Sequence, residues 1–185
     1  VEHANPTWYR REILGFVVRK LLIARKAQFV VVGNHLKPRF SNTRTFAHIP
    51  NPLPNGILNF IPLKTKKLER LIFVGRLSPD FKNPHLLLDI ASKTGYPVAF
   101  VGDGSRKHFL EEESIRLRLK VEFYGYQKFP WSIYRSGDLL IVPSDAEGDG
   151  LVLIEAISRG IPFLARKIPD LDRYGIDAKN YCNDL

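Results

Sequence analysis

Glu147 and Glu155 are the residues whose type and spacing point most clearly to chemistry in this sequence, with seven residues between them. Glu147 stands in a Gly-rich turn after an apolar run, and Glu155 stands one turn inside an expected helix. Helical side chains lean toward the N-terminus of their helix, so Glu155 is expected to reach the same crevice as Glu147. Carboxylate oxygens accept hydrogen bonds from adjacent hydroxyl groups, which suits a bound sugar. A capped helix with a solvated acidic loop fits the same pattern, and both interpretations stay open at this point.

Two cations, Arg76 and Lys82, flank an earlier strand-to-helix turn. The free N–H groups and the dipole of a helix N-terminus favour phosphate at such a turn. Arg76 can donate two parallel hydrogen bonds to a diphosphate and Lys82 can add a mobile charge, so the pair predicts a diphosphate site. The alternative is that Arg76 pairs with a surface carboxylate such as Asp80.

Glycines and aromatic residues follow the next two expected strands. The run Gly102-Asp103-Gly104 lacks the third glycine of a dinucleotide fingerprint, so we assign it to the turn first and to the crevice wall second. Tyr126 and Gln127 follow another strand, where an aromatic ring or a backbone carbonyl could hold a flat base. A surface aromatic without a ligand is the alternative for Tyr126.

A regular alternation of strands and helices is needed to bring these side chains to one edge of a sheet. Strands are predicted at 71–75, 98–101, 121–124, 139–142 and 162–165, and helical segments at 84–94, from 104 to about 119, at 131–135 and at 151–160. The last helix is expected to bury Leu151, Ile154 and Ile157 and to end at Gly160. The alternation predicts right-handed crossovers and an α/β, Rossmann-like parallel sheet with helices on both faces.

Composition excludes several classes of protein. The single Cys182 excludes a disulfide framework and a Cys-based zinc site and fits a reducing cytoplasm, and the five His residues lack metal-ligand spacing. We therefore expect neither a metal nor another cofactor. No apolar run approaches the length of a membrane span, and no signal peptide is evident at the start.

Positive charge is concentrated at the front of the chain. Residues 1–70 hold 13 Lys and Arg against 3 Asp and Glu, whereas the remainder holds 15 against 16. Basic and apolar residues interleave with helical spacing over residues 10–26, which is typical of an amphipathic helix on an anionic membrane surface. We therefore expect a cytoplasmic protein that is peripheral on the inner face of the membrane and binds no nucleic acid. A solvated basic face is the alternative.

These motifs, in this order, resemble the carboxyl-terminal, donor-binding domain of the family-four retaining glycosyltransferases, which have two facing Rossmann-like domains (the GT-B architecture). The matching segments are Gly75-Arg76-Leu77 with Lys82, residues 101–104, residues 123–126, and residues 143–162 with both glutamates. The resemblance covers most of residues 28–165.

The resemblance implies a donor site and a reaction. Catalytic roles fall to Arg76, Lys82 and Glu147, and donor contacts to Gly75, Arg76, Lys82, Tyr126, Gln127, Glu147, Gly148, Asp149, Gly150, Leu151 and Glu155. On this basis, Arg76 and Lys82 neutralise the diphosphate, Glu147 and the backbone after it hold the sugar, and Glu155 holds the ribose. The implied function is transfer of a sugar from a nucleoside-diphosphate donor to a glycan or lipid-linked acceptor with retention, in surface polysaccharide or lipopolysaccharide synthesis.

The sequence also departs from the family pattern. Residues 80–81 add one position between Arg76 and Lys82, Asp149 stands where an aromatic residue is common, and residues 166–170 lack the usual Gly-Gly pair. The family continues beyond the position of Leu185. We therefore expect residues 1–49 to be the tail of an amino-terminal acceptor domain, 50–69 a linker, and 70–185 an incomplete donor domain that transfers no sugar alone.

Three other functions remain open on the sequence alone. A sugar-nucleotide epimerase shares the fold and the diphosphate chemistry. A non-catalytic nucleotide- or membrane-binding module would fit if the parent protein has no acceptor domain. A redox Rossmann protein is the weakest of the three, because the glycine fingerprint is incomplete.

Overall fold

The structure is a computed structural model that describes residues 67–148 and 150–182, together with Lys20, Leu21, Ala24 and residues 29–31 and 46–49. The chain divides into two compact units. The first consists of Val1–Pro52 with Ala146–Gly150, and the second of Leu53–Asp145 with Leu151–Leu185.

The first unit contains a pair of parallel strands. Strand β1, Phe29–Val31, pairs with β2, Phe46–His48. The apolar run 28–33 is predicted from the sequence to be a strand, and β1 lies inside it, whereas β2 was not predicted. Lys20, Leu21 and Ala24 are helical and exposed, and the rest of the predicted basic helix lies outside the described residues.

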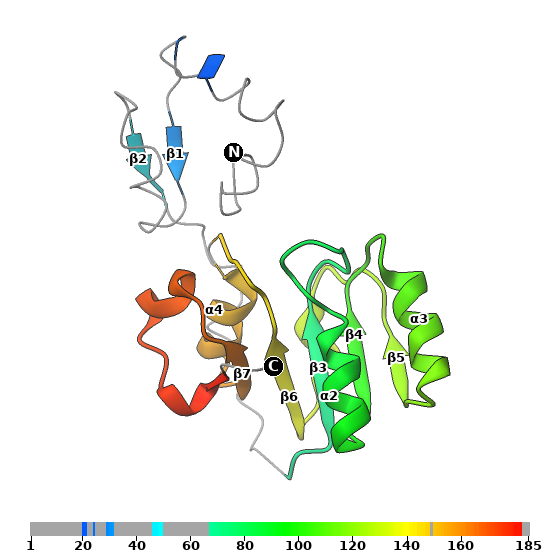
Figure 1. Cartoon of the computed structure of the whole chain (residues 1–185). Helices are drawn as coiled ribbons and strands as arrows, with labels where there is room; N and C mark the ends of the chain where they lie inside the picture. Colours follow the sequence, from blue (N-terminus) through cyan, green and yellow to red (C-terminus); the bar gives the residue numbers. More distant parts are fainter. Residues whose placement is uncertain are drawn as a thin grey trace. The chain divides into compact units, whose positions relative to one another are not determined.

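The second unit alternates strands and helices along the chain, from green to red in Figure 1. Its elements are β3 (Arg70–Val74), α2 (Leu86–Thr94), β4 (Val98–Val101), α3 (Lys107–Arg116), β5 (Val121–Phe123), η4 (Pro130–Ser132), β6 (Asp138–Val142), α4 (Leu151–Ser158), β7 (Phe163–Arg166), η5 (Pro169–Tyr174), η6 (Ala178–Asn180) and β8 (Tyr181–Cys182). The predicted order of strands and helices from residue 70 to residue 166 is confirmed, with shifts of a few residues at the ends.

The six strands form one parallel sheet in the order β5-β4-β3-β6-β7-β8. The chain first builds outward from β3 to β5, then returns to β6 beside β3 and builds in the other direction. The two central strands therefore meet at a topological switch point, where open α/β sheets bind ligands at the carboxyl ends of their strands. The predicted Rossmann-like fold is confirmed.

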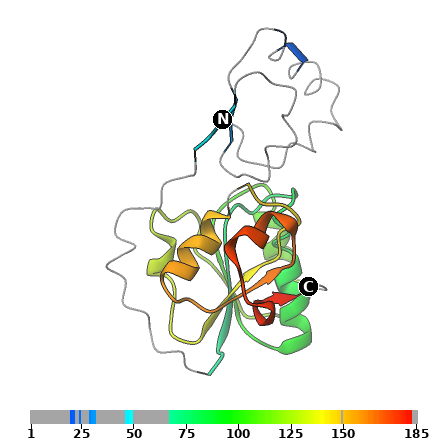
Figure 2. The same cartoon turned by 90° about the vertical axis from the view of Figure 1, so that its left-hand side faces the viewer.

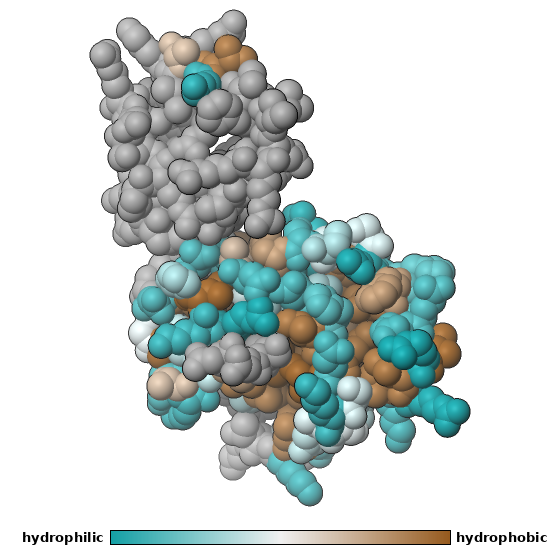
Figure 3. Space-filling model, viewed as in Figure 1, coloured by the Kyte–Doolittle hydropathy of each residue, from teal (hydrophilic) through white to brown (hydrophobic). Residues whose placement is uncertain are grey.

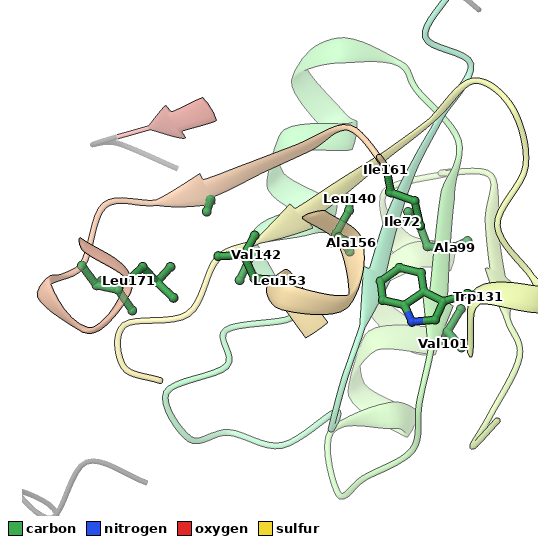
Figure 4. Close-up of a cluster of buried hydrophobic side chains, with 12 residues drawn as sticks. Ile72, Ala99, Val101, Trp131, Leu140, Val142, Leu153, Ala156, Ile161 and Leu171 are labelled. Carbon is green, nitrogen blue, oxygen red and sulfur yellow. The ribbon is translucent and has the colours of Figure 1, made fainter. Parts of the chain in front are cut away.

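Alternating strand residues create two cores, one on each face of the sheet. On one face Leu71 and Phe73 pack with Leu87 and Leu88 of α2 and with Leu110 of α3. On the other face, drawn in Figure 4, the core consists of residues from β3, β4, β6 and β7 together with Leu153 and Ala156 of α4, Trp131 of η4 and Leu171 of η5. Figure 2 shows the green helices and the gold helix α4 on opposite sides of the sheet.

The buried face of α4 differs from the predicted one. Leu153 and Ala156 are buried, whereas Leu151 is 37% exposed and Ile157 44% exposed, and Ile154 is half-buried. The prediction failed because this helix is apolar on almost every side, so spacing alone does not single out one face. The predicted stop at Gly160 is confirmed: its φ is 62°, and the backbone N–H of Ile161 donates to the carbonyl of Ala156.

The surface of the second unit is mixed in character. Figure 3 shows hydrophilic side chains over much of the described surface, with hydrophobic ones between them. Among the helices described, none is long and apolar enough to cross a membrane.

Candidate functional site at the carboxyl edge of the sheet

A pocket of about 410 Å³ opens where β3, β4 and β5 end. Its walls come from the three loops that follow these strands and from the start of η4. They consist of Val74, Gly75, Arg76, Val101, Gly102, Asp103, Tyr126, Gln127 and Pro130. The structure thus brings together four of the predicted donor-binding residues, Gly75, Arg76, Tyr126 and Gln127. The turn at Gly102-Asp103 lines the same pocket, which confirms the second role predicted for it.

Backbone hydrogen bonds join the loops of this pocket. Gly75 N–H donates to the carbonyl of Val101 (3.0 Å), and Gly102 N–H donates to that of Gly125 (2.8 Å). A β-carbon at Gly102 would lie only 1.8 Å from the Gly75 carbonyl oxygen, and φ at Gly102 is 147°. Glycine is therefore required at this position by the close approach of two backbones, in addition to its role in the turn.

Two side chains of the pocket, those of Arg76 and Tyr126, remain available to a ligand. Arg76 is exposed, and no described residue forms an ion pair or hydrogen bond with its guanidinium. The alternative pairing with Asp80 is absent from the described part of the chain, because Asp80 instead accepts the backbone N–H of Lys82 at 3.3 Å. Tyr126 is 78% exposed, whereas the Gln127 side chain donates to the Tyr124 carbonyl at 2.8 Å.

A second set of contacts ties the loop after β3 to the segment after β6, across the switch point. The carbonyl of Phe81 accepts the backbone N–H of Asp145 at 2.8 Å, and the Asn83 amide donates to the Asp145 carboxylate at 2.7 Å. Arg166, at the end of β7, also pairs with Asp145. Phe81, which directly precedes Lys82 and belongs to the segment predicted to be longer than in the family, thus supplies part of an anchor. The Lys82 ammonium lies 5.6 Å from the centre of the Phe81 ring.

Glu155 is held by an unpredicted partner. The indole Nε1–H of Trp131 donates to Glu155 Oε2 at 2.5 Å. Glu155 does not line the pocket itself, but Pro130 does, and Trp131 is the next residue. The structure therefore links the second glutamate to the pocket through η4.

The remaining predicted residues lie around the first glutamate. Glu147 is 7% exposed, and Gly148 and Gly150 are buried; all three belong to the first unit. Leu151 begins α4 in the second unit, and Asp149 lies outside the described residues. No group of three or more His, Cys, Asp or Glu side chains that could hold a metal ion occurs in the described part of the chain.

Sequence reasoning missed two contributors to this edge, Trp131 and Asp145. Trp131 belongs to none of the segments that match the family, and Asp145 lies in the matching segment 143–162 without a role assigned to it. A buried Trp beside a helical glutamate becomes visible only when η4 and α4 are placed together in space, because the two residues are 24 positions apart.

The chain matches the family model described as "Glycosyl transferases group 1" over residues 57–182. Similar proteins include sulfoquinovosyl transferase SQD2 of Arabidopsis thaliana, 35% identical over 107 residues, which are 55% of this chain and 20% of that protein. The amylovoran biosynthesis glycosyltransferase AmsD of Erwinia amylovora is 34% identical over 116 residues, covering 60% of this chain and 33% of its own length. The chain spans about a third or less of these relatives.

Solved structures show the same fold at lower identity. A variant of S. aureus TarM in complex with fondaparinux, alpha-GlcNAc-glycerol and UDP aligns with a TM-score of 0.77 at 21% identity, covering 97% of this chain and 39% of that one. Anabaena HepE in complex with UDP and glucose aligns with a TM-score of 0.72 at 20% identity, covering 93% and 53%. Since the family model covers more than half of the chain, this protein belongs to the group 1 glycosyl transferases, on the GT-B type of Rossmann-like fold.

Proposed function

We propose that this chain supplies the donor-binding domain of a retaining glycosyltransferase, with a nucleoside-diphosphate sugar held at the carboxyl edge of the sheet. One observation carries the proposal. An exposed arginine with no ion pair among the described residues lines a pocket beside the switch point, where phosphate is expected in this fold. HepE and TarM, which share the fold, were solved with UDP.

The residues divide the donor between them. Arg76, with Lys82, neutralises the diphosphate, and Gly75 lets the backbone approach it. Tyr126 and Gln127 flank the base, and Glu155 accepts hydrogen bonds from the ribose. Glu147 holds hydroxyls of the transferred sugar, together with the backbone of residues 148–151.

The proposed reaction needs charge stabilisation more than it needs a base. The leaving nucleoside diphosphate gains negative charge as the glycosidic bond breaks, so cations already in place stabilise the transition state more than the ground state. Retention follows if the acceptor attacks from the face that the diphosphate leaves. We propose that the side chains do this without a metal ion, so that excess chelator leaves donor binding unchanged.

The acceptor is proposed from the relatives and from the basic front of the chain. A sulfoquinovosyl transferase and an amylovoran biosynthesis enzyme are among the similar proteins, which favours a glycan or a lipid-linked acceptor in surface polysaccharide synthesis. The basic segment 10–26 would hold the protein on the cytoplasmic face of an anionic membrane. Binding to phosphatidylglycerol vesicles that disappears in high salt would support this part.

The test is calorimetric titration of this chain with UDP, GDP and ADP, with the matching nucleosides as controls. We expect one diphosphate to bind, and its nucleoside to bind at least tenfold more weakly, because the charge-assisted contacts to the diphosphate are lost. Equal affinity for diphosphate and nucleoside would refute the site. This chain alone should transfer no sugar to an acceptor. Robust transfer by it would refute the proposal that it supplies donor binding and nothing more.

A further inference from the structure

The hydrogen bond between Trp131 and Glu155 joins two elements at the side of the donor pocket. The Trp131 indole N–H is a donor only, and it uses Oε2 of the carboxylate at 2.5 Å. The other oxygen, Oε1, accepts no hydrogen bond from the described residues. An ionised carboxylate has about four acceptor positions, so most of the capacity of Glu155 remains for a ligand.

Trp131 is itself fixed by packing. Its side chain is 8% exposed and belongs to the core beneath α4, where Figure 4 shows it facing Ala99 and Val101. The guanidinium of Arg159 lies 5.6 Å from the indole ring centre and donates to the Glu155 carbonyl at 3.3 Å. A buried indole held between the sheet and a cation cannot follow Glu155 into another rotamer, so its N–H acts as a fixed point.

The same short helix touches the pocket. Pro130 forms part of the pocket wall, and Trp131 follows it. The pocket wall at Pro130 and the carboxylate on α4 are therefore joined through η4.

We infer that Trp131 is a positioning residue that sets Glu155 for the ribose of the donor, and that it thereby confers selectivity for ribonucleotides over deoxyribonucleotides. This inference rests on the proposed function, because it takes the ligand to be a nucleoside diphosphate. With Oε2 fixed by the indole, Oε1 is held where it accepts from a ribose hydroxyl. Without the indole N–H, the glutamate rotates freely and must be ordered again by each ligand.

The experiment compares the tightest-binding diphosphate among UDP, GDP and ADP with its 2′-deoxy and 3′-deoxy forms. In the native chain we expect the ribonucleotide to bind about tenfold more tightly than at least one deoxy form, as for a hydrogen bond to a charged group. Trp131→Phe, which keeps an aromatic ring but removes the N–H, should reduce this ratio to about threefold or less. Its affinity for that deoxy form should change less than about twofold.

Glu155→Ala serves as the reference for complete loss of the ribose contact. The ratio should fall to about one in this variant, and adding Trp131→Phe to it should change nothing further. Phe129→Leu, an exposed aromatic in the same segment at 67% exposure, is the matched control and should keep the native ratio. Thermal melts of all variants show whether the fold is retained.

A measurement on the native side chains covers the case in which Trp131→Phe does not fold. The sequence has two Trp residues, so Trp8→Phe assigns the two indole N–H resonances in an NMR spectrum. The Trp131 resonance should move when the ribonucleotide is added and move less with the deoxy form.

Each outcome decides the matter. Three results would overturn the positioning role alone. They are binding of diphosphates to the native chain without a preference for ribose, a Trp131 resonance that does not respond to the nucleotide, and an equal loss of affinity for the ribo and deoxy forms in the Trp131→Phe variant. Failure of the wild type to bind any diphosphate would overturn the proposed function, and this inference with it.

Discussion

One arginine begins strand β3 and another follows its end, and the two have opposite surroundings. Arg70 begins the strand and is 5% exposed, whereas Arg76 lies two residues beyond its end and is exposed. Both face a hollow of similar size, about 450 Å³ at the amino edge and about 410 Å³ at the carboxyl edge. What differs is whether the protein itself supplies the partners of the cation.

At the amino edge the protein supplies them all. Arg70 donates to both oxygens of Asp138, at 2.8 and 2.7 Å, and to Glu122 at 2.5 Å. The Tyr124 hydroxyl and Arg135 complete the network around Glu122. The hydrogen bonds with Asp138 raise the pKa of Arg70 above its ordinary value, although burial acts in the other direction. A hollow whose central charges are matched in this way has no need of an ionic ligand.

In the pocket at the carboxyl edge, the loops after β3, β4 and β5 are held together by backbone instead. Gly75, Val101, Gly102 and Gly125 are joined by main-chain hydrogen bonds, and neither Arg76 nor Tyr126 has a side-chain hydrogen bond or ion pair with a described residue. The comparison teaches that the hollow at the amino edge uses the charge of its arginine for stability, whereas the loops of the carboxyl-edge pocket are joined through glycine backbone and leave the charge of Arg76 for a ligand.

The largest expected effect is from Asp138→Ala. It leaves the Arg70 charge buried without its bidentate partner and should cost about 3–5 kcal/mol of the free energy of unfolding. Urea denaturation measures the loss. Nucleoside-diphosphate affinity of the folded fraction should be unchanged, and a loss below about 1 kcal/mol would show that the network is dispensable.

Gly102→Ala should be the next most damaging change. The new β-carbon would lie 1.8 Å from the Gly75 carbonyl oxygen, and φ at residue 102 is 147°. Backbone strain and loop displacement together should therefore lower the free energy of unfolding by about 3 kcal/mol. Gly95→Ala is the matched control, because its φ is also positive at 75° but nothing lies within 4 Å. Gly95→Ala should lower the free energy of unfolding by about 1 kcal/mol in the same denaturation assay. Equal costs at the two sites would contradict the close-approach argument.

Arg76→Ala should separate stability from binding. The side chain has no ion pair among the described residues, so the free energy of unfolding should change by less than about 0.5 kcal/mol. Diphosphate binding should weaken by about 2 kcal/mol, roughly 30-fold, in calorimetric titration. Arg76→Lys should recover part of this, since it keeps the charge but loses the two-pronged geometry.

The smallest effect concerns pH at the amino edge. The hydrogen bond from Tyr124, followed by that from Arg70, lowers the pKa of Glu122 below its ordinary value of 4.5. The stability from this carboxylate is present above the unfolded pKa and is lost as pH falls through the lower, folded pKa. Glu122→Gln should therefore be less stable than the native chain by under about 1 kcal/mol at pH 7, and the gap should close in acid. In a Tyr124→Phe background, the difference in free energy of unfolding between the Glu122→Gln variant and its parent should be smaller. A difference that grows as the pH falls would contradict the argument.

The sequence predicted the order of the elements from residue 70 to residue 166 because apolar runs mark the strands there and glycine or proline marks many of the boundaries between elements. Gly160, for example, ended α4 as expected. The clustering of Gly75, Arg76, Tyr126 and Gln127 also followed from the sequence, since residues after parallel strands meet at one edge.

What could not be predicted depends on distance along the chain or on short elements. The prediction of the buried face of α4 was wrong because Val152, Ile154 and Ile157 are as apolar as the residues that are buried. Strand β8 has only two residues and no pattern. The Arg70–Asp138 bond joins positions 68 apart, and nothing local marks either residue.

That bond also bears on how the domain can be divided. Arg70 starts the half made of β3, β4 and β5, and Asp138 starts the half made of β6, β7 and β8. Cutting the chain between the halves would leave Asp138 without its arginine and Arg70 with Glu122 as its remaining carboxylate partner. In a split reporter built from this protein, the buried Arg70–Asp138 pair should therefore form only when the two fragments associate, and it should favour that association.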